Sequence, residues 1–177
     1  MQKPKVSVFI GISIDGFMAD ENRDISWLSI VQRDPPEDTG YKQLIEETDV
    51  LVMGRNTYDM ILSFDEWPYS GKSVFVLTHH EQESLYGEQF YNGKLTELLD
   101  FLESAGFEHV YLDGGAVIRE GLREGLVDEI TLSYVPIILG KGIPLFTSDL
   151  PRSLWQLKSS RNFPSGLMQA VYEIKQE

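Results

Sequence analysis

The sequence contains no cysteine among its 177 residues. This absence excludes disulfides, thiolate nucleophiles and cysteine-ligated metals, and it fits a cytoplasmic protein. Histidine is also scarce, because only His79, His80 and His109 are present and none has the H-E-x-x-H spacing of a zinc enzyme. We therefore expect no metal site, and any catalysis has to use other side chains.

Positive charge is scarce as well, since 15 Lys and Arg residues stand against 28 Asp and Glu residues for a formal net charge of -13. Nucleic acids and anionic membrane surfaces select concentrated Lys and Arg, so neither is an expected partner. Any phosphate that the protein binds has to be held by a local arrangement of groups.

Long apolar runs, internal repeats and low-complexity segments are missing, and no signal-peptide pattern is present. Apolar residues make up 42% of the chain and charged residues 24%, which is typical of a soluble globular protein. A chain of this length predicts one domain over residues 1–177.

Patterns of apolar residues predict strands that alternate with helices. The predicted strands cover residues 5–13, 50–53, 73–77, 110–113 and 127–135, with two more at 155–161 and 166–174. The predicted helices cover residues 26–31, 38–48, 95–105 and 116–125, and one more follows Gly54. This order predicts an α/β fold in which a mostly parallel sheet ends in an antiparallel C-terminal hairpin.

Two of the predicted strands pass into helices through glycine. Gly114 and Gly115 follow the strand at 110–113, and Gly54 follows the strand at 50–53. Glycine lets a ligand approach the backbone, and the N-terminus of the following helix offers free N–H groups and a partial positive charge. Each turn could equally be a plain connection without a ligand. The presence of two such turns favours anion binding more than a single turn would.

Five segments carry a resemblance that covers nearly the whole chain. They are Ser-Ile-Asp-Gly at 13–16, Val-Met-Gly-Arg-Asn-Thr-Tyr at 52–58, Val-Leu-Thr at 76–78, Leu-Asp-Gly-Gly at 112–115 and Gly-Lys-Gly-Ile-Pro-Leu-Phe at 140–146. In this order they resemble the dihydrofolate reductase fold, and within it the C-terminal reductase domain of the riboflavin-biosynthesis deaminase/reductase and its stand-alone bacterial relatives. The resemblance implies a three-layer α/β/α fold and an oxidoreductase without the zinc deaminase domain.

The resemblance also implies NADPH as the cofactor. The residues that it places at the cofactor are Ser13, Gly54, Arg55, Asn56, Thr57, Thr78, His79, Gly114, Gly115, Ala116, Val117 and Ile118. Arg55, with Thr78 or His79, falls where family members hold the adenosine 2'-phosphate, and a guanidinium suits a phosphate by bidentate hydrogen bonding. The alternative for Arg55 is a surface ion pair.

Hydride transfer to a ring C=N bond needs a proton source, which in dihydrofolate reductases is an acidic residue on the helix before the second strand. Asp38 falls near that position, with Glu37 beside it, and it is our candidate acid. A helix starting there would set the Asp38 side chain, shielded by apolar residues, at the edge of the cavity that the nicotinamide enters past Ser13 and Asp15. Asp38 could instead only cap that helix. Asp15 is the second candidate, with Asp15-Gly16 turn chemistry as the alternative.

The sequence leaves the substrate open. The leading interpretation is a small nitrogen heterocycle, either pterin-like or a ribosylaminopyrimidine phosphate, for which Arg33, Lys42 and Lys72 are the basic residues at hand. The second is a carbonyl or imine compound reduced on the same scaffold. The third is a nucleotide-binding module that has no working proton donor.

The segment at residues 136–146 predicts a homodimer. It carries Ile137, Ile138, Leu139 and Ile143 in an irregular, glycine-rich stretch that a monomer would struggle to cover. The resemblance points to the same assembly.

Overall fold

The computed structural model describes residues 2–175, which pack into two compact units. Unit 1 contains the chain up to Val8 and Glu46–Val127, and unit 2 contains Phe9–Ile45 and the chain from Asp128 onward. The first strand, β1 (Lys5–Ser13), contributes its first half to unit 1 and its second half to unit 2. The single domain over residues 1–177 stays a prediction.

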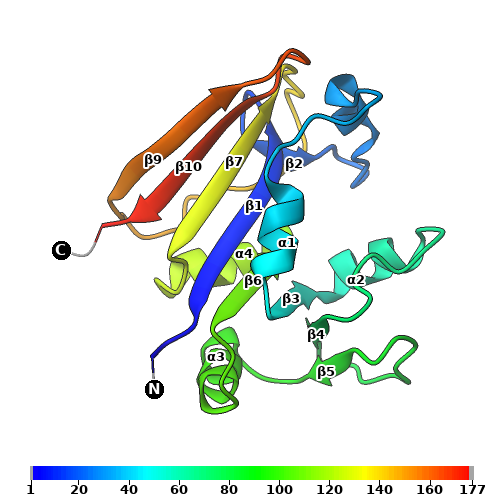
Figure 1. The fold of residues 1–177 in the computed structure, drawn as a ribbon, viewed down its shortest axis with the longest axis vertical. Helices are drawn as coiled ribbons and strands as arrows, with labels where there is room; N and C mark the ends of the chain where they lie inside the picture. The colour runs from blue at the N-terminus through cyan, green and yellow to red at the C-terminus, as the bar shows by residue number, and fades with distance from the viewer. Residues whose placement is uncertain (1, 176–177) are drawn as a thin grey trace. The chain divides into compact units, whose positions relative to one another are not determined.

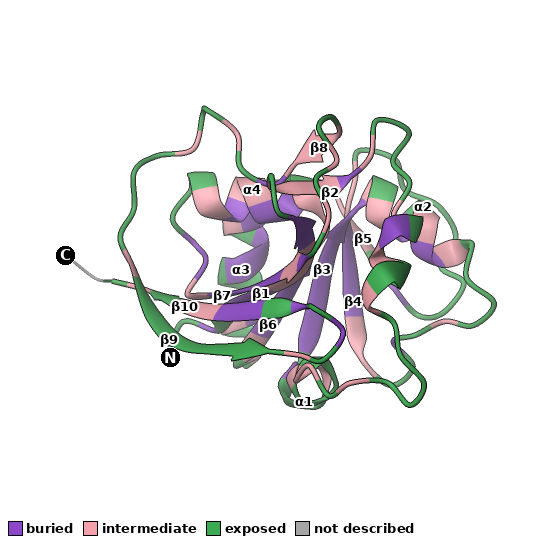
Figure 2. Cartoon of the chain, turned by 90° about the horizontal axis from the view of Figure 1, so that it is seen from above, coloured by how far each residue is buried: buried purple, intermediate pink, exposed green. Residues whose placement is uncertain are grey.

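Unit 1 is built on a sheet in which every neighbouring pair of strands is parallel (Figure 1). In the order β5-β4-β3-β6-β1, the strands that join β1 are β5 (Gln89–Tyr91), β4 (Ser73–Leu77), β3 (Val50–Gly54) and β6 (His109–Asp113). All five residues of β3 are buried, as Figure 2 shows. A run of apolar residues without alternation is expected there, because helices cover both faces of a parallel sheet.

The helices of unit 1 lie on opposite faces of this sheet. They are α2 (Arg55–Leu62), α3 (Leu95–Ser104) and α4 (Gly115–Arg123), with α3 packed on α4. Phe75 of β4 meets Phe101 of α3 at 6.2 Å between ring centroids. The next residue of β4 pairs with Phe90, whose ring lies 5.5 Å from that of Tyr58 on α2. Since successive strand residues face opposite sides, unit 1 has three layers.

Unit 2 contains the antiparallel part of the fold. Strand β10 (Met168–Ile174) pairs with β7 (Glu129–Val135) on one side and with β9 (Trp155–Asn162) on the other. A 3-10 helix at Ser26–Val31 carries Trp27 into a cluster with Val135 and Leu167. The predicted fold class is therefore confirmed, including the C-terminal hairpin.

One predicted helix begins later than expected. The helix predicted at residues 38–48 is α1 (Tyr41–Glu47). The Asp38 carboxylate accepts a hydrogen bond from the Gly40 N–H at 3.0 Å, and Gly40 has a φ of 81°, so a separate turn precedes the helix. Strands β2 (Phe17–Ala19), β5 and β8 (Ile143–Pro144) were not predicted, because two or three residues are too few to show a period.

The helices are short, and the longest, α3, has 10 residues. Among residues 2–175, none combines the length and the apolar character that crossing a bilayer requires.

Candidate functional site

The two glycine turns of unit 1 stand at the carboxyl ends of neighbouring strands. β3 and β6 are paired in parallel, with Met53 opposite Asp113. The connection from β3 leads through α2 to β4, whereas the connection from β6 leads through α4 past β1, so the chain direction across the sheet reverses between β3 and β6. In open α/β sheets ligands bind at such a reversal, outside the carboxyl ends of the strands.

The start of α2 touches the start of α4. A Cβ atom on Gly114 would lie 2.0 Å from Oγ1 of Thr57, and Gly114 also has a φ of 100°. Beside this contact, a Cβ on Gly54 would lie 3.7 Å from the Cβ of Ala116. Only glycine fits at position 114, so the two predicted anion turns form one backbone cradle.

Neither helix start is capped by a side chain. The N-cap residues are Gly54 for α2 and Gly114 for α4, and neither offers an oxygen to the N–H groups of the first turn. Asn56 and Ala116 are exposed in these first turns. The two helix starts therefore present N–H groups and positive dipole ends that suit a phosphate.

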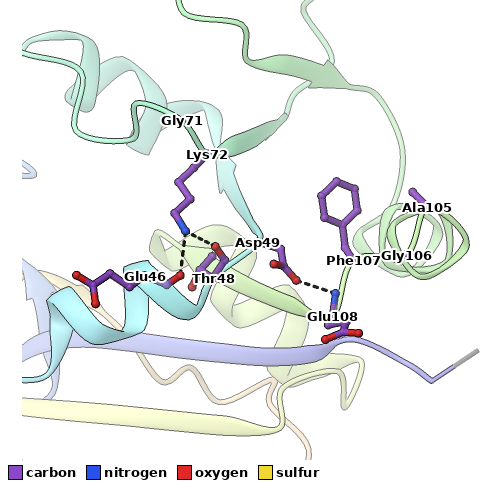
Figure 3. A pocket seen from close by; sticks show the side chains of 9 residues that line it. All are labelled: Glu46, Thr48, Asp49, Gly71, Lys72, Ala105, Gly106, Phe107 and Glu108. Carbon is purple, nitrogen blue, oxygen red and sulfur yellow. Dashed lines mark hydrogen bonds between the residues drawn. The ribbon is translucent and has the colours of Figure 1, made fainter.

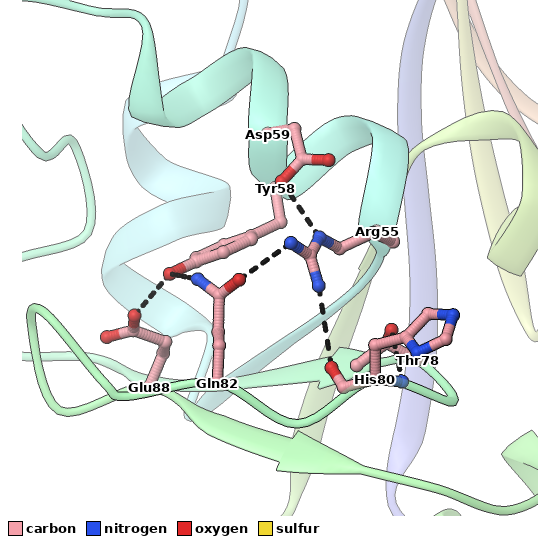
Figure 4. Close-up of polar contacts among 7 residues, drawn as sticks. All are labelled: Arg55, Tyr58, Asp59, Thr78, His80, Gln82 and Glu88. Carbon is pink, nitrogen blue, oxygen red and sulfur yellow. Dashed lines mark hydrogen bonds and ion pairs between the residues drawn. The ribbon is translucent and has the colours of Figure 1, made fainter.

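Arg55 lies beside the end of β4 (Figure 4). Its Nε donates to the Asp59 carboxylate at 2.8 Å, its Nη2 to the Gln82 amide oxygen at 2.6 Å, and its Nη1 to the His80 carbonyl at 3.4 Å. The ion pair considered for Arg55 is thus present, with Asp59 as the partner. Three of the five guanidinium N–H donors are used, and within residues 2–175 the other two have no acceptor.

The neighbours predicted to help Arg55 also make local bonds. Thr78 accepts a hydrogen bond from the His80 N–H at 3.1 Å, and the Nδ1 of His79 bonds the Asn92 side chain at 2.9 Å. The structure therefore places Arg55 against His80, next to the predicted Thr78 and His79, at the end of β4.

A chain of hydrogen-bonded side chains continues from Arg55 through the exposed Gln82 to two buried residues, and the sequence did not reveal it. Gln82 donates to the hydroxyl of Tyr58 at 3.2 Å, and that hydroxyl donates to Glu88 at 2.5 Å. Tyr58 is 0% exposed and Glu88 is 3% exposed. The polar stretch 81–88 has no periodicity that would mark Glu88 as buried.

Glu88 is ionised despite its burial. Burial by itself would raise the pKa of this carboxyl, but hydrogen bonds from the Leu85 N–H, the Tyr58 hydroxyl and the Tyr86 N–H outweigh it and lower the pKa to about 2. Burial and the adjoining Glu88 carboxylate raise the pKa of Tyr58 to about 12. The phenol is therefore neutral and the carboxylate charged at every physiological pH.

In unit 2, the buried Ser13 and the exposed Asp15 form a hydrogen bond with each other. Ser13 is fully buried, and its hydroxyl donates to Asp15 at 2.6 Å while it accepts from the Phe17 N–H. Asp15 also accepts from the N–H groups of Leu139 and Gly140, at 3.1 and 2.8 Å. The Ser13 hydroxyl foremost, with these N–H groups, lowers the pKa of Asp15. This carboxylate fastens a turn and is a poor proton donor near neutral pH.

Asp38, the candidate acid, lacks the helix start and the apolar neighbours that its selection assumed. It is exposed, it caps a turn rather than α1, and its carbonyl accepts from Arg161 at 3.4 Å. The predicted helix cap is wrong, and so is the predicted apolar shield. The adjoining Glu37 is instead the bound carboxylate, since it accepts from the N–H and hydroxyl of Ser165 at 2.9 and 2.5 Å.

A different carboxyl group lies at the cradle. Asp113 is the last residue of β6, directly before Gly114, and it accepts a hydrogen bond from the Tyr69 hydroxyl at 2.8 Å. Burial raises the pKa of Asp113, and the bond from Tyr69 only partly offsets it. The signal in the sequence was its position immediately before the glycine pair, in the segment 112–115, but no role was predicted for Asp113.

Lys72, one of the three basic residues considered for a substrate phosphate, lies away from the cradle. Its ammonium donates to the carbonyls of Glu46 and Thr48 at 3.2 and 2.6 Å, at the amino ends of β3 and β4 (Figure 3). An open depression of about 410 Å³ lies there. The Asp49 carboxylate, which also lines this depression, accepts a hydrogen bond from the Glu108 N–H at 2.8 Å. We infer that these contacts stabilise the fold and do not form a ligand site.

The segment 136–146 is only partly exposed. Ile138 and Phe146 are 68% and 48% exposed, whereas Ile137 and Leu139 pack against the Trp27 cluster. Ile143 pairs with Ala19 in the small β2–β8 sheet. The expectation of four exposed apolar residues is therefore wrong for three of them, because local packing covers them.

The sequence matches the RibD C-terminal domain family over residues 4–169. A crystal structure described as a putative riboflavin biosynthesis protein from Shewanella sp. PV-4 is 39% identical, with a TM-score of 0.90 over 97% of this chain and 99% of that one. The uncharacterized protein YyaP of Bacillus subtilis is 26% identical over 97% of this chain and 96% of its own. Dihydrofolate reductase from Enterococcus faecalis, solved in complex with NADP(H), is 15% identical with a TM-score of 0.70 over 98% of both chains, so it shares the fold.

Proposed function

Because the chain belongs to the RibD C-terminal domain family, we propose that it is an NADPH-dependent reductase of a small nitrogen heterocycle. The observation that carries the proposal is the contact of Thr57 with Gly114, which joins two uncapped helix starts at the strand reversal. Two similar structures support the substrate class, since one is described as a putative riboflavin biosynthesis protein and the other is a dihydrofolate reductase. Ribosylaminopyrimidine and pterin substrates are therefore the first to test.

The residues of unit 1 fit the phosphates of a dinucleotide. N–H groups at 54–57 and 114–117 would hold the pyrophosphate, whereas the Ile118 N–H already donates to the Gly114 carbonyl. The two remaining N–H donors of Arg55 would hold the 2'-phosphate. When bound, NADPH supplies the hydride, and the protein contributes alignment and a proton.

We propose that Asp113, in place of Asp38, donates the proton. An acid acts near neutral pH only if a good fraction of it stays protonated. Asp113 lies where ligands gather at the strand reversal, and burial raises its pKa. Asp15 has a lowered pKa, which disfavours its protonated form. Asp38 is exposed, and its carboxylate caps the Gly40 turn.

The first test compares NADPH and NADH by titration calorimetry. We expect NADPH to bind at least about tenfold more tightly, which corresponds to roughly 1.4 kcal/mol. Arg55→Ala should narrow that difference. Equal affinities in the unmutated protein would contradict the NADPH assignment.

The second test screens substrates by the loss of NADPH absorbance. Dihydropterins and ribosylaminopyrimidine phosphates are offered first, and simple carbonyl and imine compounds second. Turnover only in the second set would favour the alternative reductase. Tight NADPH binding without turnover of either set would favour a nucleotide-binding module.

A further inference from the structure

The guanidinium of Arg55 is the exposed end of a hydrogen-bonded chain that begins at a buried carboxylate (Figure 4). We propose that Gln82 is a positioning residue that sets the cofactor specificity: anchored by Tyr58 and Glu88, it orients Arg55 toward the 2'-phosphate of NADPH. The inference rests on the proposed function and adds the residues that create the preference for NADPH over NADH.

The chain has one direction of donation. Glu88 is ionised, so it can only accept, and the single hydroxyl proton of Tyr58 is given to it at 2.5 Å. The Tyr58 oxygen can then only accept, which it does from the amide nitrogen of Gln82 at 3.2 Å. This leaves the amide oxygen of Gln82 facing Arg55, at 2.6 Å from Nη2. Any reversal of the amide would set two donors against each other.

The anchor beneath Gln82 is rigid. The Tyr58 ring is 0% exposed, with the rings of Phe90 and Trp67 at 5.5 and 6.3 Å between centroids. Glu88 also receives the N–H groups of Leu85 and Tyr86 at 3.0 and 2.7 Å, which fixes the loop that carries Gln82. Arg55 itself is partly exposed, so its own packing leaves it freer than this anchor.

Gln82 counters a competing partner of Arg55. Asp59 stands one helical turn after Arg55 and accepts from its Nε at 2.8 Å. Without Gln82 the guanidinium keeps only Asp59 and the long 3.4 Å bond to the His80 carbonyl. It then retains more of the rotamer freedom that is lost on binding a phosphate. The short hydrogen bond that Arg55 donates to the Gln82 amide oxygen fixes the plane of the guanidinium before the ligand arrives. Removing it should weaken only the contact with the 2'-phosphate.

The test uses two fragments that differ by that phosphate alone, 2',5'-ADP and 5'-AMP, with binding measured by calorimetry. We expect Gln82→Ala and Tyr58→Phe each to weaken 2',5'-ADP about five- to tenfold while 5'-AMP binding stays unchanged. The double variant should lose no more than either single one, because Tyr58 acts through Gln82. Gln89→Ala is the control, since Gln89 is an exposed glutamine of the same unit outside the chain. Circular dichroism confirms that each variant is folded.

Three outcomes would overturn the inference. They are an unchanged fragment ratio in Gln82→Ala, equal weakening of both fragments, and additive losses in the double variant. If Arg55→Ala abolishes the preference while Gln82→Ala leaves it intact, this inference fails and the proposed function stands. If the unmutated protein binds both fragments equally, the proposed NADPH preference fails and takes this inference with it.

Discussion

Oγ1 of Thr57 lies 2.0 Å from the position that a Cβ atom on Gly114 would occupy. The contact joins the starts of α2 and α4, so the shape of the cradle depends on a missing side chain at one residue. Real Cβ atoms do not approach an oxygen this closely. Any side chain at position 114 has to push the two helix starts apart.

Gly114→Ala should therefore abolish most NADPH binding. We expect a loss of at least about tenfold in affinity and a loss of about 1–3 kcal/mol in the free energy of unfolding, because alanine is also strained at a φ of 100°. Calorimetry and urea denaturation measure the two effects. Gly106→Ala is the matched control, since Gly106 has a φ of 84° but open space at its Cβ position. If both variants bind NADPH alike, the cradle is not the cofactor site.

Glu88→Gln should destabilise the protein near neutral pH by about 1–3 kcal/mol, because a buried charged acceptor with several donors is lost. The pKa of Glu88 is about 2 in the folded protein against an ordinary 4.5. A lowered pKa means that its contribution is present above about pH 4.5 and fades as the pH falls toward 2.

Urea denaturation between pH 2 and 7 measures this contribution. The parent should lose stability across the acid range, and Glu88→Gln should show a flatter profile there. Glu83→Gln, on the exposed part of the same loop, is the control. A parallel profile for the parent and Glu88→Gln would contradict the role of the buried carboxylate.

A homodimer through residues 136–146 remains our proposal for assembly. Ile138 is 68% exposed, so Ile138→Glu should shift the protein toward monomer by placing a charge in the interface. Leu85→Glu, at a residue that is 62% exposed in unit 1, should leave the dimer intact. Sedimentation velocity at micromolar concentration distinguishes the two. A monomeric parent would exclude the proposal.

The strands and helices with clear periods could be predicted from the sequence. Residues 5–13 and 73–77 are strands as predicted, and the glycine pair does join β6 to α4. These elements follow from local patterns of burial and from backbone conformations that only certain residues adopt. The five ordered segments then extended the prediction to the family.

The carboxyl groups could not be ranked from the sequence, because their chemistry depends on contacts between distant segments. Asp15 is held by N–H groups 124 and 125 residues away. Glu88 bonds Tyr58 from 30 residues away. Asp38 was selected from spacing alone, and a single Gly40 turn moved the helix start. Burial and donor count, which decide a pKa, are properties of the fold.

Asp113 provides the sharpest test of the proposed chemistry, because its raised pKa affects stability and catalysis differently. A carboxyl with a raised folded pKa binds a proton more readily in the folded state than in the unfolded state. Its stabilising effect is therefore complete below the ordinary value of 3.8 and is lost as the pH rises through the folded value. Asp113→Asn, which can still accept from Tyr69, should raise the melting temperature at pH 8 and change it little at pH 3.

The same variant should lower hydride transfer by about 100-fold or more at neutral pH, since removal of a general acid typically has that effect. NADPH affinity should change little, and single-turnover absorbance measurements on the identified substrate would report the rate. Asp38→Asn serves as the comparison and should turn over like the parent, because Asp38 is exposed and its carboxylate caps the Gly40 turn. If Asp38→Asn is the slow variant and Asp113→Asn only gains stability, then Asp38 is the proton source and Asp113 is a partly buried structural acid.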